Sequence, residues 1–110
     1  MKVVTRELIM LETQKGKVPF EEWFENLNST AFQVAIDARL ARVADGNFGD
    51  HKSVGDGVFE LRIPKGPGLR VYYGLDGPRL VVLIGGGDKS SQKKDIGKAQ
   101  ELWKEYLDAK

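Results

Sequence analysis

The sequence of 110 residues contains no cysteine and only one histidine. A disulfide framework and a thiolate metal site are therefore excluded, and a lone histidine without neighbouring acids or thiols makes a poor metal site. No apolar run is long enough to span a membrane, and the first five residues lack the charged-then-apolar order of a signal peptide. We therefore expect a cytoplasmic protein without metal or cofactor. This length predicts a single domain, residues 1–110, that folds without covalent staples.

Net charge is also low, at +1, but the charges are segregated along the chain. Residues 18–50 carry two arginines against six acids, for a net of −4. Residues 51–98 carry nine lysines and arginines against five acids, for a net of +4. Such a division can direct a polyanion to one side of a protein, although an ordinary solvated surface explains it equally well.

Hydrophobic periodicity predicts an α+β domain. A strand is expected at residues 7–13, then a short helix opened by Pro19, then a helix capped by Asn28 or Ser29. A glycine-rich connection, residues 48–57, precedes a hairpin at 58–74, a buried strand at 79–84 and a last helix at about 90–107. The expected order is strand, helix, helix, strand, strand, strand, helix, with the helices packed on one mixed, largely antiparallel sheet.

The hairpin alternates apolar and polar side chains on both of its strands. We expect the apolar set to share one packed face, leaving the polar face to work or to meet water. The simplest register closes the hairpin symmetrically around the loop at residues 64–68 and sets Arg62 opposite Arg70. In the same register Glu60 faces Tyr72. The apolar set is Phe59, Leu61, Ile63, Leu69, Val71 and Tyr73.

Two arginines that face each other across a ladder destabilise it unless something compensates their charges. Both side chains can splay into water, an acid such as Glu60 can bridge them, or an anion can bind between them. Phosphate is an anion that the planar guanidinium fork suits well. A surface ion-pair cluster without function is the plainer interpretation of the same residues.

Four segments carry a family resemblance that covers most of the chain. They are PFEEWFENL at 19–27, ARLARVADGNFGDHKSVGDGVFELRI at 38–63, GPGLRVYYG at 66–74 and GGDKSSQKKDIGKA at 86–99, followed by Trp103. In this order they resemble the RelE/ParE superfamily of bacterial toxins, and most closely its HigB-like, phage-associated "addiction module killer" branch. The resemblance implies the RelE-like fold.

The resemblance also implies a function, namely the toxin of a type II toxin–antitoxin module that arrests growth. Its expected activity is that of an mRNA interferase, a metal-independent endoribonuclease that cuts mRNA on the ribosome. Its expected partner is a cognate helix-turn-helix antitoxin, in a toxin–antitoxin hetero-oligomer. Because the superfamily places different activities on one fold, two alternatives stay open: a non-nucleolytic toxin that binds a protein such as DNA gyrase, and an inactive prophage remnant that only binds antitoxin.

In the nucleolytic members, basic residues on the second and third sheet strands and just past the fourth hold the scissile phosphate. The matching positions here are Arg62, Arg70 and Lys89. The lysine that these nucleases often carry on the second strand is replaced by Glu60, and no histidine follows the fourth strand. The resemblance therefore implies a phosphate-binding site and leaves the proton-transfer group open.

Cleaving RNA without a metal requires a base for the 2′-hydroxyl, positive charge at the phosphate and an acid for the leaving 5′-oxygen. We expect Arg62 and Arg70 to supply the charge and Glu60 to act as the base. Lys89 or Tyr72 would donate the proton or position the sugar. Tyr72 could instead stack on a base of the RNA.

Several other basic residues are candidates for RNA contact. Lys93 and Lys94 fall in the first turn of the last helix, where the dipole disfavours cations unless an anion is present, and solvated lysines behind a Ser90 or Ser91 cap are equally plausible. Histidine is the side chain type that most often serves as a general acid at neutral pH, so His51 is also a candidate for the proton-transfer group, yet a lone loop histidine is more often merely exposed. The remaining candidates are Lys52 and Lys65.

Overall fold

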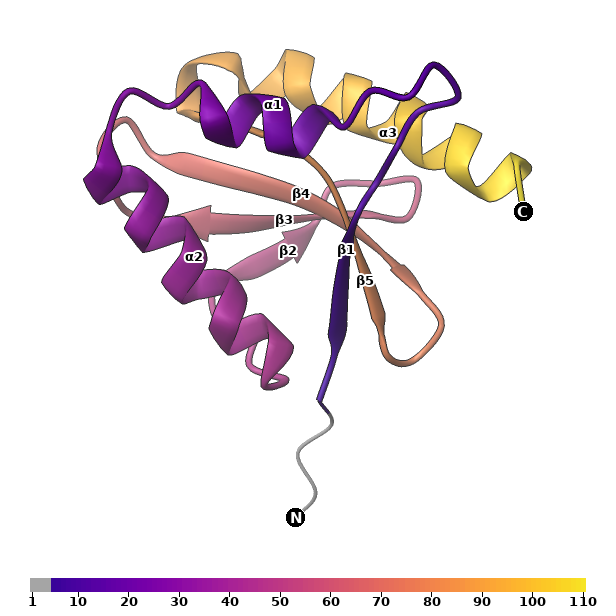
Figure 1. The fold of residues 1–110 in the computed structure, drawn as a ribbon, viewed down its shortest axis with the longest axis horizontal. Coiled ribbons are helices and arrows are strands. Elements are labelled where there is room, and N and C mark those ends of the chain that lie inside the picture. Colours follow the sequence, from indigo (N-terminus) through magenta and orange to yellow (C-terminus); the bar gives the residue numbers. More distant parts are fainter. Residues whose placement is uncertain (1–4) are drawn as a thin grey trace.

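The computed structural model describes residues 5–110, so residues 1–4, part of the segment tested above for a signal peptide, lie outside it. It confirms an α+β fold with helices packed on one mixed sheet (Figure 1). The elements are β1 (Glu7–Met10), α1 (Pro19–Glu25), α2 (Thr30–Ala44), β2 (His51–Ser53), β3 (Val58–Ile63), β4 (Leu69–Asp76), β5 (Leu80–Gly87), a 3-10 turn (Lys89–Ser91) and α3 (Gln92–Asp108).

The sheet has the strand order β1-β5-β4-β3-β2. β1 pairs with β5 in parallel, and the other neighbours pair antiparallel. The expected strand order lacked β2, whose residues were assigned to a connection. That assignment was wrong because β2 is a short, fully exposed edge strand, so it shows no alternation of buried and exposed side chains.

The helices begin where the local chemistry predicts. Pro19 occupies the start of α1, with two acids in the first turn, and the Ser29 hydroxyl accepts a hydrogen bond of 3.1 Å from the backbone N–H of Phe32. The start of α3 differs from the expectation. Asp88, rather than Ser90 or Ser91, is the side chain that caps this region, because its carboxylate accepts the Ser90 N–H and starts the 3-10 turn.

Helices cover both faces of the sheet, so the expectation of one open polar face was wrong. α1 and α2 pack on the face that holds the apolar set of the hairpin, as expected. The last helix, α3, packs on the opposite face through Ala99 and Trp103. The first core contains Phe20, Ile36, Val43, Leu61, Ile63, Leu69, Val71, Tyr73, Val81 and Leu83. The second core contains Leu11, Val58, Tyr72, Val82, Ile84, Ala99 and Trp103.

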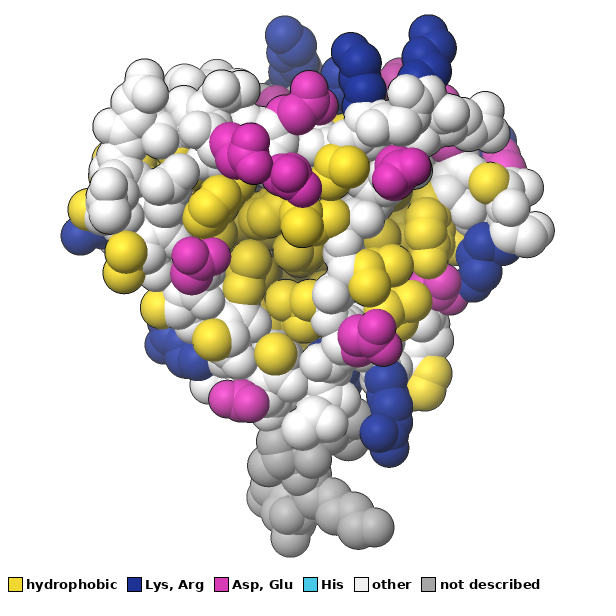
Figure 2. Space-filling model, in the orientation of Figure 1, with side chains coloured by type: hydrophobic (Ala, Val, Ile, Leu, Met, Phe, Trp, Pro, Cys, Tyr) yellow, Lys and Arg dark blue, Asp and Glu magenta, His cyan; other side chains and the backbone are white. Residues whose placement is uncertain are grey.

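The face that carries α1, α2 and β1 is apolar at its centre. Figure 2 shows apolar side chains gathered there, acidic side chains around them, and lysine and arginine side chains at the margins of the view. No helix among residues 5–110 is long and apolar enough to cross a membrane.

Candidate functional site

The hairpin has the register that its sequence predicts. Arg62 lies opposite Arg70, and Glu60 lies opposite Tyr72. The pairing continues onto β5, where Gly87 stands beside Arg70. Because paired residues on neighbouring strands share a face, these side chains form two adjacent rows across the sheet. The arginine row contains Arg62, Arg70 and Gly87. The second row contains Lys52, Glu60, Tyr72 and Gly85.

Arg62 is held at the surface by Asp50, a residue that the sequence did not single out. Its Nη2 lies 2.9 Å and its Nε 3.2 Å from Asp50 Oδ1. The side chains of Arg62 and Asp50 are 36% and 57% exposed. The backbone N–H of Arg62 also donates to the carbonyl of Asp50. The sequence would have indicated this pair only through a prediction of β2, because β2 brings Asp50 alongside the end of β3.

Glu60 is completely buried, at 0% exposure. Its Oε2 accepts a hydrogen bond of 2.8 Å from Gln92 Nε2, and its Oε1 lies 3.7 Å from Arg70 Nε. The Arg70 side chain is itself only 13% exposed. Glu60 therefore pairs with one arginine and with α3, and does not bridge the two arginines. A carboxylate without solvent access is poorly placed to take a proton from a bound substrate.

Tyr72 is also buried, at 1% exposure, under the first turns of α3. Its hydroxyl lies near Glu60 but makes no hydrogen bond of normal geometry with any residue from 5 to 110. Burial raises the pKa of the Tyr72 phenol, and the negative charges of Glu60 and Asp95 raise it further. Its ring has no open face, which excludes the stacking role considered for it.

Lys89 reaches the arginine row through the hairpin loop. Its backbone N–H donates to the carbonyl of Pro67, in the loop. A β-carbon at Gly68 would lie 3.4 Å from Lys89 Cβ and 3.8 Å from Arg70 Nη1. The structure thus brings Arg62, Arg70 and Lys89 to the same end of the sheet. The other predicted lysines, Lys52, Lys65, Lys93 and Lys94, are all exposed.

His51 lies on the other face of the sheet from the arginines. It pairs with Leu61, whose side chain belongs to the core under α1 and α2, and its ring packs against Phe48. Its Nδ1 lies 2.9 Å from the carbonyl oxygen of Gly49. Since a carbonyl only accepts, Nδ1 is the nitrogen that donates in this contact. This side chain is separated by the sheet from the arginine row.

Arg39, considered above only for its charge, supports the arginine row from within α2. It is 6% exposed, and its guanidinium donates to the carbonyls of Arg62 (2.7 Å), Phe48 (2.8 Å) and Asp50 (2.8 Å). Burial lowers the pKa of the Arg39 guanidinium below its ordinary value. These bonds fix the backbone on which the Arg62–Asp50 pair stands. A signal was available, because Arg39 lies three residues after Ile36 and four before Val43, on the buried stripe of the helix.

The arrangement suits anion binding at the exposed end of the sheet. Two guanidinium groups and one ammonium group lie there, with Asp50 and Glu60 holding one arginine each. Among residues 5–110 no group of three or more histidine, cysteine, aspartate or glutamate side chains is placed to hold a metal ion.

Comparison with known proteins identifies a relative of this chain. A Haemophilus influenzae protein described as "Uncharacterized protein" is 47% identical over 91 residues, which cover 83% of this chain and 92% of that protein. No family model matches the chain.

Proposed function

The chain belongs to the same family as this Haemophilus influenzae protein, and we propose that it is a RelE-like toxin of a type II toxin–antitoxin module, HigB-like within the RelE/ParE superfamily, which cleaves mRNA on the ribosome. The observation that carries the proposal is the pairing of Arg62 with Arg70 on adjacent strands beside Lys89. Each arginine has one carboxylate, so the pair retains donors for a phosphate bound across the row.

The site divides into groups that touch RNA and groups that hold them. Arg62 and Lys89 are open to solvent and would bind the scissile phosphate directly, with Arg70 at the base of the site. Glu60 and Gln92 are buried and would position the Arg70 guanidinium. Lys52, Lys65, Lys93 and Lys94 would hold the flanking phosphates, a role that gives binding a salt dependence. His51, on the opposite face, takes no part in this site.

Asp50 replaces Glu60 as the proposed general base. It is a carboxylate that contacts an arginine of the pair and is also open to solvent, at 57% exposure of its side chain. A base must reach the 2′-hydroxyl in a bound substrate, and Asp50 satisfies this condition where the buried Glu60 does not. Lys89 is the exposed group available to protonate the leaving 5′-oxygen.

The toxin would be neutralised by a small helix-turn-helix antitoxin in a hetero-oligomer, and it would act in the cytoplasm. The apolar centre of the α1, α2 and β1 face, ringed by acids, offers a surface for such a partner (Figure 2).

The test is expression of the Arg62→Ala, Arg70→Ala double variant in bacteria, followed by growth measurement and mapping of cellular RNA 5′ ends. We expect the wild-type protein to arrest growth and to produce codon-phased cuts, and the double variant to lose about a hundredfold or more of the cleavage. Arg79→Ala is the matched control, since this exposed arginine lies before β5 at the opposite end of the strand. Asp50→Asn should lower cleavage while leaving RNA binding intact.

The other outcomes identify other functions. Undiminished cleavage by the double variant would refute the arginine site. DNA damage with intact mRNA would show a gyrase-directed toxin, and harmless expression of a folded protein would show an inactive remnant that only binds antitoxin.

A further inference from the structure

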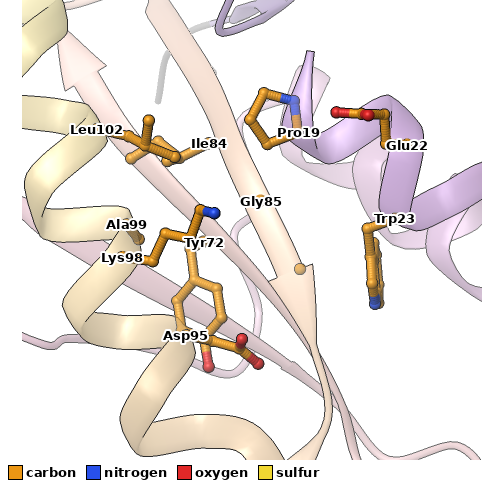
Figure 3. Close-up of a pocket in the computed structure, with 11 residues that line it drawn as sticks. Pro19, Glu22, Trp23, Tyr72, Ile84, Gly85, Asp95, Lys98, Ala99 and Leu102 are labelled. Atoms are coloured by element: carbon orange, nitrogen blue, oxygen red, sulfur yellow. The ribbon is translucent and has the colours of Figure 1, made fainter. Parts of the chain in front are cut away.

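A cavity, separate from the arginine row, lies between α1 and α3, across the end of β5 that has no neighbouring strand. The cavity has a volume of about 280 Å³. It exists because β1 pairs with β5 only as far as Leu83, and because β5 ends in three glycines without side chains, residues 85–87. Figure 3 shows Glu22 and Trp23 on one side of the strand and Tyr72, Asp95 and Lys98 on the other.

The two glycines in the middle of this cavity have opposite surroundings. A β-carbon at Gly86 would lie 2.2 Å from the ring of Trp23, so the indole rests directly on the strand backbone. A β-carbon at Gly85 would meet nothing within 4 Å. The open space therefore begins at Gly85, with an aromatic ring at its margin. Apolar contacts from Pro19, Ile84 and Leu102 complete its walls.

One wall of this space, formed by β4 and α3, contains a buried phenol and a carboxylate. The Tyr72 hydroxyl is buried, lies near the carboxylates of Glu60 and Asp95, and has no hydrogen-bond partner of normal geometry among the described residues. Figure 3 shows this hydroxyl next to the carboxylate of Asp95. Asp95 Oδ2 accepts from Ser91 Oγ at 2.5 Å, which fixes the carboxylate and leaves Oδ1 available.

We propose that this cavity binds a nucleobase bearing an exocyclic amino group, such as adenine or cytosine. The two carboxylates, Glu22 and Asp95, only accept hydrogen bonds, so the edge that faces them must carry N–H donors. A planar ring also suits a site bounded by an indole, and the small volume suits a single base.

The inference stands apart from the proposed RNA cleavage, because it uses neither Arg62 nor Lys89. The amino-bearing base could come from a free nucleoside or from one unstacked position of an RNA chain. Lys98, which lines the cavity, could contact a sugar or phosphate in either case.

The test is calorimetric titration of the purified protein with adenosine and cytidine and with their deaminated counterparts, inosine and uridine. Deamination replaces the amino group by a carbonyl, which would face a carboxylate. We expect adenosine or cytidine to bind at least about tenfold more tightly than its counterpart. A short oligonucleotide of the same base composition distinguishes the sources: tighter binding than the nucleoside indicates an RNA chain, and weaker binding indicates a free ligand.

Variants locate the binding. Gly85→Val fills the cavity and should weaken binding by about tenfold or more, and Asp95→Asn, which retains the side-chain shape, should weaken it similarly. Gly97→Ala, on α3 but outside the cavity, has no atom within 4 Å of its β-carbon and should change nothing. Thermal unfolding checks that each variant folds, and Gly85→Ala substitutes if the valine variant does not. Absence of binding, equal binding of the deaminated nucleosides, or binding unaffected by these variants would overturn the proposal.

Discussion

Replacing Arg39 with methionine tests whether this buried side chain holds the arginine row in place. Methionine retains the length and the apolar contacts of the stem and removes the guanidinium. The three carbonyls that Arg39 binds, those of Arg62, Phe48 and Asp50, then lose a charged donor at once. The end of β3 and the approach to β2 should both loosen.

The expected loss of stability follows from these bonds. A hydrogen bond to a charged group contributes about 1.5–3 kcal/mol, but carbonyls near the surface regain part of this from water. Asp50 is exposed and Phe48 half-buried, so the full sum overstates the effect. We expect a decrease of about 2–4 kcal/mol in the free energy of unfolding, which leaves a folded protein if total stability falls in the usual range of about 5–15 kcal/mol.

Urea unfolding followed by circular dichroism measures this change. With a slope of about 1–3 kcal/mol per molar urea, the midpoint should fall by roughly 1–4 M. Arg42→Met is the matched control, because Arg42 is exposed on the same helix and should change stability by less than about 0.5 kcal/mol. A loss below about 1 kcal/mol for Arg39→Met, or equal losses for both variants, would refute the supporting role assigned to Arg39.

Two further predictions concern neighbouring glycines and buried phenols. Gly86→Ala should lower the free energy of unfolding by about 1–3 kcal/mol, and with it the melting temperature, because its β-carbon would meet the Trp23 ring. Gly85→Ala, the control, should leave the melting temperature nearly unchanged. Similar melting temperatures for the two variants would contradict the packing described. Burial raises the pKa of Tyr73 to about 12 from 10.0 and raises that of Tyr72 as well, so both favour the folded state fully below pH 10.0. That stability should be lost as pH rises from 10.0, by about 1.4 kcal/mol per pH unit for each tyrosine up to its folded-state pKa, which is about 12 for Tyr73. Urea unfolding of Tyr72→Phe should show a slope that is shallower by one such contribution.

The hairpin register could be predicted because two independent features agree on it. Alternation assigns each side chain to a face, and the short loop at residues 64–68 leaves few ways to pair the strands. The opposition of Arg62 and Arg70 follows from these features alone. The strand β2 could not be found in the same way, since three exposed residues beside glycines carry no periodic signal.

The burial of Glu60 and Tyr72 depends on tertiary packing, which local sequence patterns do not predict. The apolar stripe of α3 predicts that the helix packs, but not on which face of the sheet it lies. Glu60 and Tyr72 therefore looked like members of a working surface, and α3 instead covers both. The same placement produces the cavity beside β5, which no sequence motif marks.

The alternation of side chains along each strand decides which groups lie on the same face of the sheet and can act together. Arg62 and Arg70 share a face, while His51, paired with Leu61, points to the other. A one-residue shift of β2 would have brought the histidine beside the arginines, but Arg39 and the Arg62 backbone hold Asp50 at that position. The exposed carboxylate thus occupies the place next to Arg62 that a catalytic histidine would need. Asp50 and Lys89 are therefore the exposed groups that we propose for proton transfer in RNA cleavage at this site.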